Sequence, residues 1–337
     1  MKKIPKNVTM NYIADISNVS IATVSRVFDP ATKDKVSAKT FKKIMKIADE
    51  LGYMPNRTAQ ALSRGGTNTV GLILPAGSHF STSEFYARVI MNISVFLRER
   101  SYDIKLHILR DEEEIGNIFA LKQTLGVDGL LMVGIPLSRK LLPDSFSSFP
   151  IVMMNSGARR GITTVNVDNI HGSWLAASYF HEKGHKKFGM LTGPSNSPDA
   201  KERIEGFKQY LKQNKLNVNK NWFLPCRHGE KEGYDAGLKL LKQRSKPTAV
   251  FCTNDEAAFG LMRAAKELGM NCPNDIAIIG FDNLSATQYT SPPLTTIEQP
   301  IIEMTSAAVD LLLKLIKKPT STTHEVFPAK IIERESA

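Results

Sequence analysis

VTMNYIADISNVSIATVSRVF, residues 8–28, predicts two short helices joined by a tight turn. Thr9 can cap the first helix through its hydroxyl, and Met10 and Ile13 then fall on one apolar face. Asn18 tolerates the left-handed backbone that a tight turn often needs. We therefore expect the first helix to support the second by packing against it.

The second helix has an apolar inner face and an outer face that packing does not need. Ser20 can cap this helix, and the residues left facing outward are Ile21, Ala22, Ser25 and Arg26. In a helix-turn-helix, exposed residues at this end of the second helix enter the major groove of DNA, where an arginine can bind guanine O6 and N7. Capped amphipathic helix pairs also occur in ordinary helical bundles, so a purely structural role stays open.

The positive charge of the chain is concentrated near its N-terminus. Residues 1–66 hold 12 Lys and Arg against 5 Asp and Glu, whereas the other 271 residues hold 32 against 28. Phosphate contacts supply much of nucleic-acid affinity through counterion release, so this distribution suits a DNA duplex better than a membrane. A solvated lysine-rich surface is the alternative interpretation.

A third helix is predicted to begin after the cap Ser37 and to end at Gly52. The stretch NRTAQALS, residues 56–63, follows with a capping Asn, helix-forming residues and one large apolar side chain, Leu62. A helix this short is not stable alone in water. We therefore expect either a linker or a segment that becomes ordered when a partner packs on it.

From Thr69 onward, short apolar runs alternate with helical patterns. Strand-like runs such as TVGLIL, GLLMVG, AVFCT and IAIIGF are separated by amphipathic stretches such as residues 85–99 and 257–268. This alternation predicts parallel sheets covered by helices on both faces, and the length favours two lobes facing each other across a cleft. The predicted fold class is α/β, with an all-α helix-turn-helix headpiece in front of a two-lobed body.

Ligands of open α/β sheets bind beyond the carboxyl ends of the strands. Polar or aromatic side chains at those positions are therefore candidates for binding a small polar molecule. They are Phe85, Asn155, Asn254 and Asp282, together with Arg203, which adds a fork of donors. An Asp or Asn after a strand can instead cap a helix, and Arg203 could pair with a surface carboxylate.

TVSRVF, GYMPNRTAQALS, TNTVGLILP, VNVDNIHG, KGHKKFGMLTGP, RIEGFKQYL, PTAVFCTNDEAAFG, IAIIGFDN and SPPLTTIEQP follow one another along the chain. This series resembles the motifs of the lac-repressor/gal-repressor family of bacterial transcription regulators, over residues 8–335. The resemblance implies the two-lobed architecture of periplasmic sugar-binding proteins. It also implies that Arg203, Asn254 and Asp282 fall where effector-contacting residues recur.

The resemblance further implies that residues 56–63 form a hinge helix that folds on the operator and wedges Leu62 into the minor groove. Such a wedge unstacks a base step at a cost of about a few kcal/mol and bends the duplex. Candidate DNA contacts are Thr9, Ser20, Ile21, Ala22, Thr23, Ser25, Arg26, Asn56, Arg57, Ala59 and Leu62.

Two departures from the family pattern weaken the expectation of a plain sugar effector. Asn155 and Ser156 stand where many members carry Asp-Arg, and the loop 76–84 lacks the usual Asn-Pro pair before Phe85. The first change removes a carboxylate and a guanidinium, and with them two charge-assisted contacts.

HEKGH, residues 181–185, matches the zinc-protease pattern H-E-x-x-H. Gly184 is expected to end the helix, which would place His185 in a loop rather than beside His181. The three cysteines, at positions 226, 252 and 272, are too few and too scattered for a metal knuckle or a disulfide framework. The sequence therefore predicts no catalytic residue, no metal and no cofactor.

The expected domains are a DNA-binding domain at residues 1–55, a hinge at 56–68 and an effector-binding and dimerisation domain at 69–337, with chain crossings between lobes near 165, 298 and 320. A cytoplasmic location is expected, because the sequence shows no apolar signal segment and no apolar run of the roughly 18 residues that a membrane span needs. The unpaired thiols fit a reducing compartment.

The predicted function is repression of transcription by binding double-stranded operator DNA, under control of a small polar effector, a sugar or a sugar derivative, between the lobes. A homodimer is expected, since the chain lacks the leucine heptads that tetrameric relatives append. The alternative is a soluble sugar-binding receptor with no DNA-binding role.

Replacing Leu62 by Ala should weaken binding to a selected operator while sparing binding to an unrelated duplex, because only the specific complex uses the wedge. Fluorescence anisotropy with both duplexes measures the two affinities. An equal loss on both would contradict the wedge role.

Overall fold

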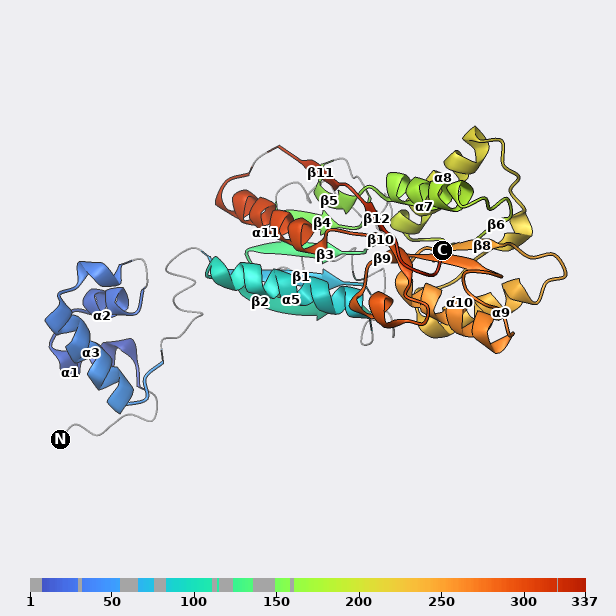
Figure 1. The fold of residues 1–337 in the computed structure, drawn as a ribbon. Coiled ribbons are helices and arrows are strands. Elements are labelled where there is room, and N and C mark those ends of the chain that lie inside the picture. Colours follow the sequence, from blue (N-terminus) through green and yellow to red (C-terminus); the bar gives the residue numbers. More distant parts are fainter. Residues whose placement is uncertain are drawn as a thin grey trace. The chain divides into compact units, whose positions relative to one another are not determined.

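The computed structural model describes residues 8–29, 32–54, 66–75, 83–110, 114, 124–135, 149–157, 161–319 and 321–337. The chain separates into two compact units, Met1–Thr67 and Asn68–Ala337 (Figure 1). Within the described ranges, no helix is both long and apolar enough to cross a membrane.

The described part of the first unit consists of short helices that begin where the sequence predicts. They are α1 (Met10–Ser17), α2 (Ile21–Val27), the 3-10 turn η1 (Lys33–Lys35) and α3 (Ala38–Glu50). The hydroxyls of Thr9, Ser20 and Ser37 accept hydrogen bonds from the N–H groups three residues on, and so cap the three α-helices. Asn18, with a φ of 50°, supplies the left-handed turn between α1 and α2.

A small apolar core holds the three α-helices together. Its fully buried members are Ile13, Ala14, Val24, Val27 and Ile44. The amine of Lys43 on α3 also donates to the carbonyl oxygen of Ser17 at 2.8 Å, which fixes α3 against the end of α1. The packing therefore uses the inner faces of the helices and leaves the outer face of α2 free.

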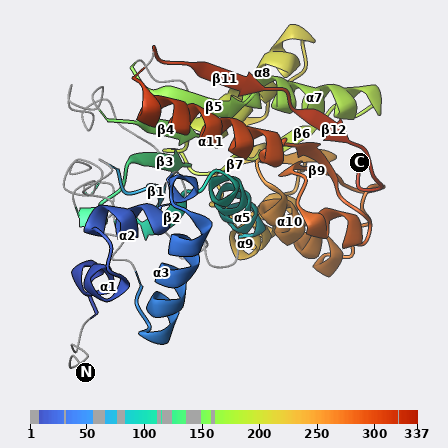
Figure 2. The same ribbon diagram turned by 90° about the vertical axis from the view of Figure 1, so that its left-hand side faces the viewer.

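The described residues of the first lobe of the second unit form a parallel sheet, with two described helices on one of its faces. Among the described residues its strands run in the order β11-β5-β4-β3-β1-β2. They are β1 (Thr69–Leu74), β2 (Asp103–Ile108), β3 (Gly129–Val133), β4 (Ile151–Met154), β5 (Thr163–Val167) and β11 (His324–Phe327). The helices α5 (Glu84–Glu99) and α11 (Ile301–Lys317) lie side by side on it (Figures 1 and 2).

The second lobe is a similar sheet with helix pairs on both faces. Its described strands run in the order β12-β10-β9-β8-β6-β7, and β12 is antiparallel to β10. They are β6 (Phe188–Leu191), β7 (Phe223–Leu224), β8 (Ala249–Cys252), β9 (Ala277–Asp282), β10 (Thr295–Glu298) and β12 (Lys330–Ile332). The helices are α7 (Asn169–Glu182), α8 (Pro198–Gln213), α9 (Glu230–Leu241) and α10 (Asp255–Glu267), with 3-10 turns η6 (Lys220–Trp222) and η7 (Ser285–Tyr289).

Alternate residues of the central strands point to opposite faces of the second sheet. Phe251 belongs to the core beneath α7 and α8, whereas its neighbours Val250 and Cys252 belong to the core beneath α9 and α10. All four residues of β8 are buried for this reason. The prediction of two parallel-dominated lobes flanked by helices is confirmed, with β12 as an antiparallel addition.

The described chain passes between the lobes at three places. It leaves the first lobe after β5, at Asp168, and returns to it after β10, through Gln299 and Pro300. The last crossing lies at residues 328–329 rather than near 320, because His324–Phe327 still pairs with β5 in the first lobe.

Glycines allow α9 and α10 to approach each other closely. A Cβ at Gly260 would lie 2.1 Å from the carbonyl oxygen of Glu230, and one at Gly233 would lie 2.3 Å from that of Ala257. Both contacts are with backbone atoms, so a side-chain rotation cannot relieve them.

Gly260→Ala should lower the free energy of unfolding of the second unit by about 1–3 kcal/mol, because the added methyl separates α9 from α10. Helix propensity alone predicts the opposite, a gain of about 1 kcal/mol. Urea denaturation distinguishes the two, with Lys266→Ala at an exposed position of the same helix as the control. An increase in the free energy of unfolding would show that α9 and α10 can accommodate the methyl group without a loss of packing.

Candidate functional sites

The outer face of α2 presents side chains that the first unit does not use for packing. Ile21 is 49% exposed, and Ala22, Ser25 and Arg26 are exposed as well. Thr23 is half-buried, with its hydroxyl 2.9 Å from that of Ser20. A short arginine-bearing face of this kind fits into a major groove.

Four of the predicted DNA contacts, Asn56, Arg57, Ala59 and Leu62, lie outside the described residues. Their roles therefore rest on the sequence.

In the second unit, the structure brings three of the five predicted effector residues together. Asn155 follows β4 in the first lobe, Asp282 ends β9 in the second lobe, and Arg203 lies on α8. Each is about 95% buried, with exposed fractions of 4%, 5% and 4%. Arg203 is therefore an interior group and not a partner for a surface carboxylate.

The guanidinium of Arg203 is fixed by four groups of the second lobe. Its Nε donates to Asn169 Oδ1 at 2.8 Å, and Nη1 donates to the carbonyl oxygen of Thr253. The carbon of the guanidinium lies 3.6 Å from the centre of the Phe281 ring, and Nη1 lies 3.8 Å from Asp282 Oδ1. The orientation of this cation is thus set before any ligand arrives.

Gln299, which the sequence analysis did not select, connects the two lobes. Its amide oxygen accepts a hydrogen bond of 3.0 Å from Asn155 Nδ2, and its Nε2 donates to Asp282 Oδ1. Asn155 Oδ1 is buried and has no hydrogen-bond partner among the described residues. Because an unpaired buried acceptor is costly, this oxygen is suited to receive a donor from a ligand.

The backbone is strained at the same place. Asn155, Asp282 and Asn283 have φ values of 49°, 123° and 52°, in the region that favours glycine. Such conformations cost about 1–3 kcal/mol each and concentrate at functional sites.

Several carboxyl groups, buried or partly buried, lie beside these residues. Burial raises the pKa of Asp282 well above its ordinary value, although Arg203 opposes the shift. Burial likewise raises the pKa of Asp199 to about 6, again against Arg203. Asn169 contacts two carboxyl groups one turn apart on α8, since its Nδ2 donates to Asp199 Oδ1 at 3.3 Å and to Glu202 Oε2 at 2.9 Å.

The remaining two predicted residues have other contacts. Asn254 caps α10 by accepting a hydrogen bond from the N–H of Ala257 at 3.3 Å, the alternative that the sequence left open. Phe85 packs edge-on against Tyr86, with ring centres 5.1 Å apart.

Tyr86 lies closer to the predicted effector residues than the sequence indicates. Burial, followed by the charges of Asp199, Asp282 and Glu256, raises the pKa of its phenol, which therefore stays protonated and able to donate. A Cβ at Gly134, just after β3, would lie 2.7 Å from the Tyr86 hydroxyl. The glycine leaves room for this side chain at the carboxyl end of the sheet.

The histidines of HEKGH have separate partners. His181 Nδ1 lies 3.0 Å from the Tyr210 hydroxyl, and His185 Nδ1 lies 3.0 Å from the Thr248 hydroxyl. The left-handed φ of 88° at Gly184 separates them. Over the described residues, no group of three His, Cys, Asp or Glu side chains is placed to hold a metal.

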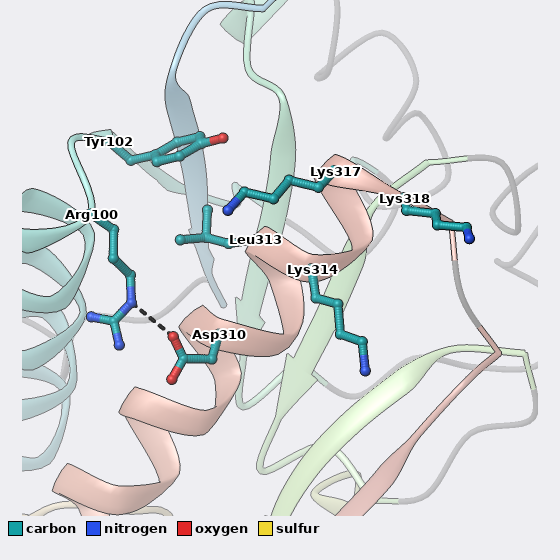
Figure 3. Close-up of a pocket in the computed structure, with 7 residues that line it drawn as sticks. All are labelled: Arg100, Tyr102, Asp310, Leu313, Lys314, Lys317 and Lys318. Carbon is teal, nitrogen blue, oxygen red and sulfur yellow. Dashed lines mark hydrogen bonds and ion pairs between the residues drawn. The ribbon is translucent and has the colours of Figure 1, made fainter. Parts of the chain in front are cut away.

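A cavity of about 450 Å³ lies apart from these residues, on the first lobe between the end of α5 and α11 (Figure 3). Arg100 Nε donates to Asp310 at 2.8 Å on one side of it. The other lining residues are Tyr102, Leu313, Lys314, Lys317 and Lys318. The amines of Lys314 and Lys318 point in different directions, so they do not converge on one ligand.

Comparison with known families matches both units. Residues 9–56 match the family described as bacterial regulatory proteins, lacI family, and residues 177–337 match a periplasmic binding protein-like domain. The match at residues 9–56 excludes the alternative of a sugar-binding receptor with no DNA-binding role.

Individual proteins are similar to this chain over most of its length. The HTH-type transcriptional repressor PurR of Vibrio vulnificus (strain CMCP6) is 33% identical over 316 residues, which cover 92% of each protein. A Lac repressor structure described as bound to ONPG in the repressed state has a TM-score of 0.89 and 25% identity, covering 98% of this chain and 100% of that one. A LacI family regulator from Enterococcus faecium with bound ribose has a TM-score of 0.70 and 28% identity, covering 80% and 98%.

These proteins are transcription regulators and not enzymes. The PurR relative and the Lac repressor structure span both the helical unit and the two-lobed unit, so the match includes the DNA-binding part and the ligand-binding part together. The chain therefore belongs to the lacI family of bacterial regulatory proteins, as a DNA-binding transcriptional repressor under allosteric control by a small-molecule effector.

Proposed function

We propose that the effector of this repressor is a small, polar, donor-rich molecule such as a sugar or sugar derivative, bound by Asn155, Arg203 and Asp282. The observation that carries the proposal is the unpaired, buried Oδ1 of Asn155 beside the interlobe bridge through Gln299. A hydroxyl or N–H of the ligand would satisfy this acceptor. The ribose in the Enterococcus faecium relative supports the same class.

The charges around the cleft support an uncharged effector. Arg203 is the cation of the group, and its donors already serve Asn169 and Thr253. The neighbouring Asp199, Glu202 and Asp282 bring carboxyl groups, which accept hydrogen bonds from a neutral hydroxyl and, when ionised, repel an anion. Asn155 offers an amide oxygen where family members carry a carboxylate, which fits a neutral hydroxyl.

The DNA-binding part of the proposal uses the outer face of α2. Arg26 would read a guanine and Ser20, Ile21, Ala22, Thr23 and Ser25 would contact the groove, while Thr9 would contact a phosphate. Residues 56–63, with Asn56, Arg57, Ala59 and Leu62, would form the hinge in the minor groove. A repressor of chromosomal operators acts in the cytoplasm.

We also propose that the protein pairs through the first lobe as a homodimer. Met91 and Val95, one turn apart on α5, are 62% and 48% exposed, and Leu106 and Ile108 on the edge strand β2 are 48% and 50% exposed. An exposed apolar surface beside an open sheet edge is a typical protein contact. Two copies joined there would present two α2 helices to a near-palindromic operator.

Asp282→Asn should abolish the response to the effector, because the amide replaces a ligand acceptor with a donor. The measurement is the thermal shift of the full chain with sugars, sugar phosphates and small acids, followed by operator affinity with the best compound. A ligand at 100 times its Kd stabilises by about 2.7 kcal/mol, and this gain should disappear in the variant. Glu205→Gln, an exposed change on α8, is the control.

Two outcomes would contradict the proposed effector site. One is a panel in which no compound shifts the unfolding temperature. The other is a compound whose shift is the same in Asp282→Asn as in the unchanged protein.

The double variant Met91→Asp, Val95→Asp should convert a dimer to a monomer, because four buried carboxylates would face one another across the interface. Sedimentation velocity measures the change, and Val218→Asp, at an exposed apolar position of the second lobe, is the control. A dimer that persists in the double variant would place the interface elsewhere.

A further inference from the structure

The first turns of α5 bond directly to the second lobe, although α5 belongs to the first. Glu84 Oε1 accepts a hydrogen bond of 2.7 Å from the N–H of Ser285. One turn further on, Arg88 Nη1 donates to the carbonyl oxygen of Asn283 at 3.0 Å. The two contacts join residues 195 and 201 positions apart in the sequence.

In a third contact, a side chain of the second lobe reaches the start of α5. Glu256, on α10 of the second lobe, lies beside the start of α5. The Ser83 hydroxyl and the N–H of Glu84 are close enough to its carboxylate to lower its pKa, against the larger effect of burial, which raises it. Ser83 is the N-cap of α5, and its side chain makes no capping bond within its own helix. The carboxylate of Glu256 therefore lies near the open N–H groups at the start of α5 and belongs to the other lobe.

The partner loop on the second lobe is itself firmly held. Asn283 Nδ2 donates to Glu298 at 2.9 Å, and its Oδ1 accepts from Arg334 Nη2 at 2.9 Å. The next residue, Leu284, donates its N–H to Asp255 Oδ2 at 2.8 Å. Contacts of α5 with this loop therefore act on the body of the second lobe.

We infer that Glu84, Arg88 and Glu256 form an interlobe clamp that positions α5 and holds the lobes closed. The clamp is distinct from the effector residues, but it grips Asn283, the neighbour of Asp282. Further along α5, Met91 and Val95 form part of the proposed dimer surface. Release of the clamp would therefore move one helix that touches both the second lobe and the partner subunit.

This inference rests on the proposed function in one respect, namely that lobe closure alters operator affinity. Burial, the largest effect, and the nearby carboxylate of Glu84 raise the pKa of Glu256, while the Ser83 hydroxyl and the N–H of Glu84 at the helix start lower it. The guanidinium of Arg88 is paired with a carbonyl oxygen of the other lobe. Water would replace these partners only if the lobes separated.

Hydrogen exchange on the full chain tests the clamp without any ligand. The double variant Glu84→Ala, Arg88→Ala removes two of the three contacts, and we expect exchange in the first turn of α5 and in residues 283–289 to rise at least tenfold. The conservative variant Glu84→Gln, Arg88→Lys keeps an acceptor and a donor at the same places and should exchange as the unchanged protein does. Arg98→Ala, exposed near the other end of α5, is the control.

Exchange of β8 in the same samples reports whether the second lobe stays folded. Protection there should not change, so that increased exchange at α5 and residues 283–289 reflects separation of the lobes and not unfolding. If the Ala variant exchanges like the control, or if the conservative variant exchanges as fast as the Ala variant, the clamp is overturned.

Operator affinity of the same variants separates the inference from the proposed function. We expect the Ala variant to change the operator Kd at least fivefold relative to Arg98→Ala, and the direction identifies the closure state that binds DNA. Faster exchange with an unchanged Kd would support the clamp and overturn the proposed coupling of closure to DNA binding.

Discussion

The hydrogen bonds of Gln299 to Asn155 and Asp282 are the interaction on which the arrangement of the two lobes depends. Gln299 stands where the chain returns from the second sheet to the first, and its amide reaches one strand end in each lobe. An amide has a donor NH2 group and an acceptor oxygen. Because the Gln299 Nε2 donates to Asp282, only its oxygen is left for Asn155. Asn155 in turn must donate to Gln299, and its buried oxygen is the atom left without a hydrogen-bond partner among the described residues.

The cost of this arrangement is carried by the packing around it. Asn155 and Asp282 occupy strained backbone conformations, and Arg203 is a buried cation. Isolated, each of these features would be unfavourable. Here the two sheets, buried on both faces of their central strands, and the ring of Phe281 beneath Arg203 provide a rigid setting. Because the setting is rigid, the polar groups at the strand ends keep the same positions before a ligand binds.

The helix α5 connects three parts of the second unit, namely the second lobe, the effector residues and the exposed apolar surface of the first lobe. Its first turn contacts the second lobe and carries Tyr86 near the effector residues. Its middle exposes Met91, and its end leads to the edge strand β2. A single rigid helix can therefore report a change in the cleft at a distant surface, provided that the lobes have two discrete arrangements.

The sequence alone determined the local structure of this protein. Hydroxyl caps, the left-handed Asn18 and the apolar faces define the helices of the first unit, because these signals act over three or four residues. The alternation of apolar strands and helices likewise determined the two lobes, and the rule that ligands bind at strand ends selected Asn155 and Asp282.

Only the tertiary structure decided which polar groups meet. Gln299 and Asn155 are 144 positions apart, and nothing local in either segment indicates the other. The same holds for Glu256 of α10, which lies beside the start of α5. It also holds for Tyr86, since the sequence analysis selected its neighbour Phe85 instead. From the sequence, Arg203 could either bind an effector or pair with a surface carboxylate. Its burial beside Phe281 and Asp282 rules out the surface pair. Hydrogen bonds and burial depend on how separate elements are placed in space, so these residues become recognisable only after the chain has folded.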